Sequence, residues 1–190
     1  GAKVCMTKET HESGTDRLQE VVSLLALADD QVLVNVQGDE PLIPPAVIDQ
    51  VARLMQAPET QMATLFEVIQ DEKQVFDPNA VKLVSDDLGH ALYFSRAPIP
   101  WYRDGFSQAQ SLPNAISYKR HIGIYGYRAA LLNQFVHWPV SSLEAVEKLE
   151  QLRAMSHGVR IRVEEAMEPI PAGVDTQHDL DVVRAILAKA

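Results

Sequence analysis

Two carboxylates directly follow a short apolar run in the segment Val32–Pro41, whose sequence is VLVNVQGDEP. The run lacks polar alternation and is rich in β-branched residues, which predicts a strand buried on both faces of a helix-covered parallel sheet. Ligands of such sheets bind beyond the carboxyl ends of the strands. Beyond the end of this strand, Gly38 allows the backbone to approach a ligand closely, and Asp39 and Glu40 offer oxygen ligands for a divalent cation. A turn with solvated acids has the same sequence, so both interpretations stay open at this point.

A second polar segment, TKETHESGTDR at 7–17, leads into a helix that we expect near 16–28. Ser13, Gly14 and Thr15 stand at its start, where a hydroxyl can cap the helix or help to cradle a polar ligand. The buried stripe expected on this helix has the i, i+3, i+4, i+7 spacing and comprises Leu18, Val21, Val22 and Leu25.

Two further segments carry groups that can bind a polar ligand. The predicted strand 119–128, KRHIGIYGYR, places His121, Gly123, Tyr125 and Tyr127 on one face. The segment 141–155 begins with a capping box, Ser141 with Glu144, and is expected to form one helix. Its expected buried side comprises Leu143, Val146, Leu149 and Leu152. A strand histidine and helical polar groups also occur without any ligand.

Composition excludes several classes of protein. The chain has 190 residues, 46% hydrophobic and 23% charged, which suits a single domain over 1–190. A net charge of −9 with no basic run beyond Lys119-Arg120 argues against nucleic acid as a partner. Cys5 is the single cysteine, so no intrachain disulfide can form and we expect a reducing compartment, the cytoplasm. No apolar run approaches membrane-spanning length, and no signal-peptide pattern opens the chain.

The remaining elements must position these residues. We expect an α/β fold with a helix opened by Pro44-Pro45, strands at 62–68 and 160–165, a hairpin of 80–84 with 90–95, and a last helix at 177–188. The segment 101–117 is a long loop with aromatic residues, Trp101 among them, and loops of that length are usually functional or mobile.

Six motifs occur in an order and spacing that closely resemble the bacterial CMP-Kdo synthetase family, the 3-deoxy-manno-octulosonate cytidylyltransferases. They are VNVQGDEPLIP, PNAVKLV, ALYFSRAPIPW, KRHIGIYGYR, SSLEAVEKLEQLR and GVDT. The resemblance covers essentially the whole chain. It implies a Rossmann-like nucleotide-diphospho-sugar transferase fold, with a mostly parallel sheet flanked by helices and one antiparallel excursion.

The resemblance implies that CTP and the sugar acid Kdo react to give CMP-Kdo and pyrophosphate for lipopolysaccharide biosynthesis, with Mg²⁺ as cofactor. It also implies a homodimer, for which we expect 101–117 and the hairpin to form the interface. The alternatives are a CMP-sialate-type synthetase and a non-catalytic fragment that binds a sugar acid or dimerises. The segments KRHIGIYGYR and LEQLR argue against the sialate enzyme.

The residue roles below are likewise implied by the resemblance. Asp39 and Asp175 match the magnesium-binding aspartates, and Arg17 would offset charge near the reacting phosphate. Ser13 and Gly14 match the segment that flanks the substrates. The sugar-acid pocket would be formed by Gln37, Arg96, His121, Tyr125, Glu150 and Gln151. Glu150 and Gln151 are consecutive on the expected helix, so their side chains point about 100° apart. Both can line the pocket only if the edge of that helix faces it.

One family feature is absent from the sequence. The family pattern begins with a loop of the form IPARxxSxRLPGKPL, which grips the CTP phosphates, whereas this sequence begins about where the family's third strand is expected. From this we expect the 190-residue polypeptide to be inactive by itself.

Overall fold

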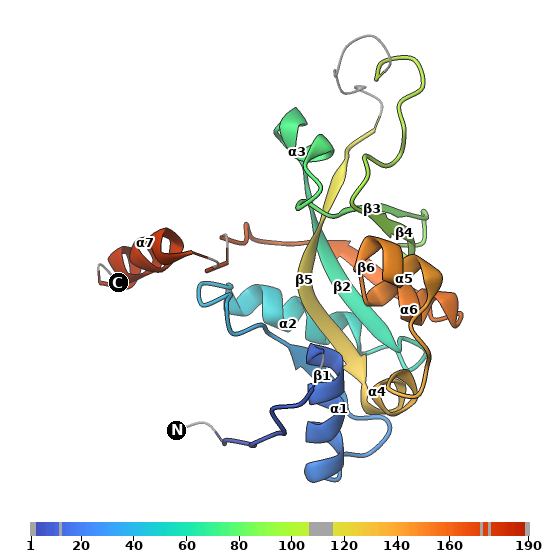
Figure 1. The fold of residues 1–190 in the computed structure, drawn as a ribbon, viewed down its shortest axis with the longest axis vertical. Coiled ribbons are helices and arrows are strands. Elements are labelled where there is room, and N and C mark those ends of the chain that lie inside the picture. The colour runs from blue at the N-terminus through green and yellow to red at the C-terminus, as the bar shows by residue number, and fades with distance from the viewer. Residues whose placement is uncertain (1–2, 12, 107–115, 172, 175, 189–190) are drawn as a thin grey trace.

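The structure, a computed structural model, describes residues 3–11, 13–106, 116–171, 173–174 and 176–188, which form a mixed sheet with helices on both faces (Figure 1). The strands are β1 (Val32–Asn35), β2 (Met62–Val68), β3 (Lys82–Ser85), β4 (Ala91–Ser95), β5 (Lys119–Arg128) and β6 (Ile161–Glu165). The helices are α1 (Gly14–Leu24), α2 (Pro45–Leu54), α3 (Glu72–Phe76), α4 (Ala129–Phe135), α5 (Ser142–Glu147), α6 (Gln151–Ser156) and α7 (Gln177–Leu187). In this part of the chain no helix is long and apolar enough to cross a membrane.

The long strand β5 organises the sheet, whose order is β4-β3-β5-β2-β6 with β1 also paired to β5. Strand β2 follows one edge of β5 over its whole length, so β1 and β3 share the other edge, one at each end. The middle of this second edge of β5 therefore lies between β1 and β3.

The expectation of a mostly parallel sheet is wrong in its strand directions. Among the described strands only β2 and β6 pair in parallel, and β5 is antiparallel to β1, β2 and β3. Parallel neighbours need a crossover connection. The segment from β2 to β6 contains helices α4 to α6 and provides one, whereas β5 follows the β3–β4 hairpin and a loop. The hairpin itself is confirmed.

Strand β1 is also less buried than expected. All four of its residues are half-buried, it ends at Asn35, and the following Val36 is 37% exposed. The reason is its place: among the described residues β1 pairs only with the end of β5. The carboxylates of Asp39 and Glu40 still follow a strand end, as predicted.

Two apolar layers cover the sheet. On one face α2 packs Val47, Val51 and Met55 against Ile122 and Ile124 of β5. On the other face α4 and α6 pack against Tyr125 and Tyr127. The alternation predicted for β5 is therefore confirmed. Gly126 allows α2 to approach, since a Cβ there would lie 2.6 Å from Met55 Cγ.

The single helix expected at 141–155 is wrong: the segment forms α5 and α6, separated at Lys148. Lys148 has the left-handed conformation, φ 56° and ψ 46°, which ends α5. Leu143 and Val146, expected to be buried, are 46% and 83% exposed. The inner side of α5 is filled instead by Glu144, which accepts hydrogen bonds from Arg153 Nε at 2.8 Å and Nη2 at 2.5 Å.

Helix α1 is shorter than the 16–28 segment expected. It ends at Leu24, and Ala26 has a φ of 47°. Val22 lies in the core as predicted, whereas Leu25 lies beyond the helix end and is 56% exposed.

Candidate active site

A pocket of about 220 Å³ lies beside the middle of β5, toward the free stretch of edge between β1 and β3. We call it the Tyr125 pocket. Its lining comes from the turn after β1, from β5 and from the α5–α6 junction: Gln37, His121, Gly123, Tyr125, Tyr127, Lys148, Leu149, Glu150 and Gln151. The structure thus brings together five residues predicted for the sugar-acid pocket, namely Gln37, His121, Tyr125, Glu150 and Gln151.

Two polar atoms of this pocket are buried and without a hydrogen-bond partner in the described part of the chain: Tyr125 Oη and Gln151 Nε2. The side chains are only 9% and 6% exposed. A buried polar group left unpaired costs about 1–3 kcal/mol, and most such groups in folded proteins are paired. Two of them in one pocket indicate a site shaped for a ligand with several hydrogen-bonding groups.

His121 lies in the pocket as a neutral ring. Burial, and to a smaller extent the charge of Arg120, lower its pKa to about 3. Thr64 Oγ1 donates to a backbone carbonyl, either Ile124 O at 2.8 Å or Ile122 O at 3.0 Å. Since its one proton is used there, His121 Nε2, at 3.1 Å, must donate to Thr64. This leaves Nδ1 as an acceptor, which suits a ligand hydroxyl.

Both tyrosines of the pocket remain protonated donors. Burial raises the pKa of Tyr125, with added contributions from Tyr127 and the Glu150 carboxylate. Burial also raises the pKa of Tyr127, and Glu150 adds to it. Stacked rings 5.6 Å apart hold the two side chains in place. The pocket therefore offers hydroxyl donors, an imidazole acceptor and a carboxylate, a set that recognises a polyhydroxylated molecule.

Glu150 and Gln151 both line the pocket at the start of α6, where Glu150 has helical backbone angles and Gln151 is the first residue of the helix. The edge of this helix therefore faces the pocket. Sequence analysis missed the pocket residues Lys148 and Leu149, and did not assign Tyr127 to it. For Tyr127 the two-residue period of β5 was the available signal, whereas nothing in EAVEKLEQLR marks the break.

Arg96 lies outside the lining of the pocket. Its guanidinium donates to Glu147 O at 2.7 Å and Pro78 O at 2.9 Å, so it holds the end of α5 against the segment before β3. Arg128 is similarly committed, to the carbonyls of 30, 55, 57 and 60. The substrate-binding role of Arg96 stays a prediction.

The start of α1 lies near the pocket without lining it. Ser13 caps the helix, since its Oγ accepts from Asp16 N at 3.2 Å, and Gly14 is the first helical residue. Arg17 donates to Thr7 Oγ1 at 2.5 Å and Lys8 O at 3.1 Å, and so fixes the preceding segment. Glu20 of the same helix bonds His11 at 2.5 Å. The predicted roles of these three residues remain predictions.

Asp39 is exposed after β1, next to the segment that precedes the last helix. Val174 N donates to Asp39 O at 2.8 Å, and a Cβ on Gly173 would lie 3.2 Å from that oxygen. Asp175 itself lies outside the described residues. Among the residues described, no group of three or more metal-ligating side chains occurs. A Mg²⁺ ion held by one or two carboxylates, water and phosphates does not need such a group, so the residues fit.

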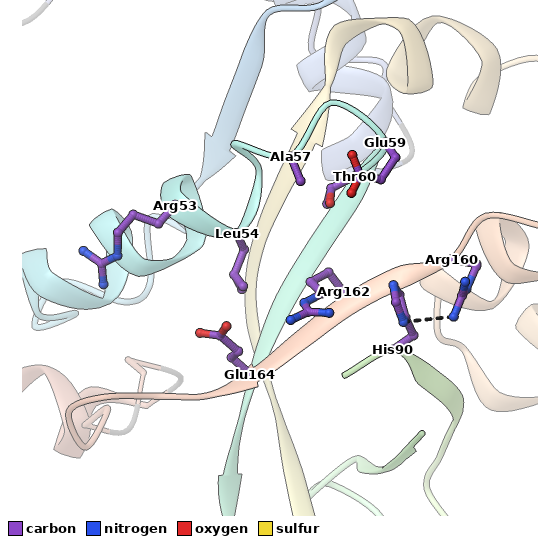
Figure 2. A pocket seen from close by; sticks show the side chains of 9 residues that line it. All are labelled: Arg53, Leu54, Ala57, Glu59, Thr60, His90, Arg160, Arg162 and Glu164. Carbon is purple, nitrogen blue, oxygen red and sulfur yellow. Dashed lines mark hydrogen bonds between the residues drawn. The ribbon is translucent and has the colours of Figure 1, made fainter. Parts of the chain in front are cut away.

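A larger cavity, about 600 Å³, lies on the β6 side of the sheet (Figure 2). We call it the Arg162 cavity. It is lined by Arg53, Leu54, Ala57, Glu59, Thr60, His90, Arg160, Arg162 and Glu164. Its β6-side arginines hold the turn between β3 and β4: Arg162 donates to Leu88 O, and Arg160 bonds His90 at 3.0 Å and Asp86 at 3.3 Å. None of the predicted site residues that the structure describes lines this cavity.

A helix-covered sheet with a carboxylate at a strand end and a polar pocket beside it is an arrangement that suits an α/β nucleotidyltransferase. Residues 1–161 match the family described as Cytidylyltransferase. The 3-deoxy-manno-octulosonate cytidylyltransferases of Alcanivorax borkumensis and Saccharophagus degradans are each 60% identical, over 97% and 98% of this chain and 74% and 75% of theirs. The chain belongs to the cytidylyltransferase family, among the 3-deoxy-manno-octulosonate cytidylyltransferases.

Solved structures agree with this assignment. The structure of CMP:2-keto-3-deoxy-manno-octonic acid synthetase complexed with CTP matches with a TM-score of 0.88 at 39% identity, covering 100% of this chain and 73% of that one. The 4-diphosphocytidyl-2C-methyl-D-erythritol synthase from Anaerococcus prevotii matches with a TM-score of 0.51 at 12% identity, over 94% of this chain and 65% of that one, and shows a shared fold only.

Proposed function

We propose that the protein activates 3-deoxy-manno-octulosonate, Kdo, with CTP and releases CMP-Kdo and pyrophosphate for lipopolysaccharide biosynthesis. The observation that carries this proposal is the Tyr125 pocket, with its two buried unpaired polar atoms. Kdo is rich in hydroxyls, and each hydroxyl can both donate and accept. The choice of CTP is supported by relatives named as cytidylyltransferases and by the 39% identical structure that holds CTP.

In the proposed reaction the anomeric oxygen of Kdo bonds the α-phosphorus of CTP as pyrophosphate leaves and the hydroxyl proton is released. Gln37, Tyr125 and Gln151 orient the sugar acid for this attack. Positioning of this kind supplies much of the catalysis in phosphoryl transfer. Neutral His121 accepts from a sugar hydroxyl without adding positive charge to the pocket.

Asp39 and Asp175 would hold the proposed Mg²⁺. When bound, this cation offsets the charge of the phosphate oxygens in the transfer. The exposed Asp39 carboxylate lies at the end of β1, in the turn that also supplies Gln37 to the Tyr125 pocket. Metal and sugar acid would thus be brought together by one turn.

The assembly and the compartment are also proposals. Leu92 of the hairpin and Trp101 are 60% and 59% exposed, which supports a contact with a second copy there. The part of the predicted interface at 107–115 lies outside the described residues. In sedimentation experiments we expect the unchanged protein to be a dimer and Trp101→Glu to weaken that dimer. A monomeric unchanged protein would contradict the proposed assembly.

The proposed compartment is the cytoplasm. It is supported by Cys5 as the single cysteine and by CTP as the substrate.

The function is tested by pyrophosphate release from CTP with Mg²⁺ and one of two sugar acids, Kdo or N-acetylneuraminate. We expect release with Kdo and less than a hundredth of that rate with N-acetylneuraminate. Equal rates or a preference for N-acetylneuraminate would overturn the assignment of the pocket.

A further inference from the structure

Helix α1 reaches the Tyr125 pocket through one buried side chain, Thr15. Thr15 is the second residue of the helix and only 5% exposed. Its hydroxyl donates to Glu150 Oε2 at 2.8 Å, although the two residues are 135 positions apart in the sequence. The contact joins the start of α1 to the α5–α6 junction.

The hydrogen bond between Thr15 and Glu150 has a fixed direction. A carboxylate only accepts, so the proton of Thr15 is committed to Glu150. The buried hydroxyl of α1 therefore holds one carboxylate oxygen of Glu150 at the edge of the pocket.

Little else in the described residues fixes the Glu150 carboxylate. Glu150 precedes α6 and makes no capping hydrogen bond there. Its Oε2 accepts from Thr15, which leaves Oε1 as the second acceptor of the carboxylate. A flexible glutamate loses side-chain entropy when a ligand orders it, and a preordered one loses less.

We propose that Thr15 is a positioning residue for the sugar acid: its hydroxyl fixes Glu150 so that the second carboxylate oxygen is ready to accept from a sugar hydroxyl. The inference rests on the proposed function of the same pocket. It adds a residue from α1 that does not itself line the pocket.

The test compares Thr15→Val, which keeps the shape and removes the hydroxyl, with Thr15→Ser, which keeps the hydroxyl. Thr60→Val, the same change in the Arg162 cavity, is the matched control. Pyrophosphate release is measured while Kdo and CTP are varied separately, and melting temperatures are recorded. We expect Thr15→Val to raise the KM for Kdo about tenfold with the KM for CTP within twofold, and Thr15→Ser and Thr60→Val to stay near the unchanged protein.

Repeating the substitution in a protein that already carries Glu150→Ala makes the test specific. In Glu150→Ala the carboxylate is gone, so adding Thr15→Val should change the KM for Kdo by less than twofold. An unchanged KM for Kdo in Thr15→Val would overturn the inference. So would a rise in both KM values together with a clear fall in melting temperature, because that is the pattern of a merely structural residue. Failure of the unsubstituted protein to use Kdo would instead overturn the proposed function.

Discussion

The Tyr125 pocket and the Arg162 cavity differ in how their polar groups are satisfied. The cavity is the larger, about 600 Å³ against 220 Å³, and carries more charge. Yet Arg160 and Arg162 bond protein atoms of the turn between β3 and β4, and Glu164 accepts from Gln50 at 3.2 Å. The smaller pocket instead contains two buried atoms without partners among the described residues. The proposed binding site is therefore distinguished by its unsatisfied polar groups and not by its volume.

The largest contrast is expected between two aspartates. Asp39 is exposed and its carboxylate is proposed to hold Mg²⁺, so Asp39→Asn should lower kcat more than a hundredfold and leave the melting temperature unchanged. Asp86 accepts from the backbone N–H of Leu88 and His90, which lower the pKa of its carboxyl. Asp86→Asn should therefore lower the melting temperature and leave kcat intact.

Turnover rates measured over a series of Mg²⁺ concentrations test the prediction for Asp39→Asn. Near-normal turnover of Asp39→Asn at low Mg²⁺ would show that the metal assignment is wrong. Asp175→Asn should behave like Asp39→Asn in the same series.

The Tyr125 pocket and the Arg162 cavity should also respond differently to acid. With a pKa of about 3, folded His121 stays neutral, whereas an unfolded histidine protonates near pH 6.5. The unfolded chain thus binds more protons between these values, and His121 makes stability fall as the pH drops from about 6.5 toward 3. From pH 7 to 5 this contribution is at most about 2 kcal/mol.

Urea unfolding at pH 7 and pH 5 measures this effect. His121→Asn should lose less stability between the two pH values than the unchanged protein. His90→Asn in the Arg162 cavity is the matched control. If His121→Asn and the unchanged protein lost equal stability, the histidine would not be held neutral by the fold.

A third contrast uses two tyrosines. Tyr125→Phe removes an unpaired buried hydroxyl, so it should stabilise the free protein by about 1 kcal/mol and raise the KM for Kdo about tenfold. Tyr118 is also buried, but its hydroxyl donates to Pro100 O at 2.7 Å, so Tyr118→Phe should destabilise the protein by about 1 kcal/mol. Denaturant unfolding would contradict the account if both changes had the same sign.

The smallest expected effect lies in the Arg162 cavity. Arg162→Leu removes a hydrogen bond to Leu88 O and should cost about 1 kcal/mol or less, with kcat and both KM values unchanged. A tenfold rise in either KM would mean that the larger cavity takes part in substrate binding.

The sequence predicted local structure better than strand direction. The limits of β2 at Met62–Val68 and of β5 at Lys119–Arg128 were predicted correctly, because apolar periodicity marks them. The antiparallel direction of β5 was missed, because an apolar run does not state which neighbour it pairs with. The break at Lys148 was missed because Glu, Ala, Lys, Leu and Gln all favour a continuous helix.

The candidate site was predicted in part. The resemblance implied a pocket that includes Gln37, His121, Tyr125, Glu150 and Gln151, which the structure brings together. Alternation in β5 predicted only that His121 and Tyr125 share one face of the strand. The helix-capping alternative for Ser13 is present in the structure. Thr15 could not be connected with Glu150 from sequence, because only the folded chain brings them together.

A crystal structure of the protein with Kdo tests the central claim most directly. We expect Kdo in the Tyr125 pocket, with one or two of its oxygens within about 3.2 Å of Tyr125 Oη and Gln151 Nε2. Kdo bound in the Arg162 cavity, or in the Tyr125 pocket with both atoms still unpaired, would contradict the account.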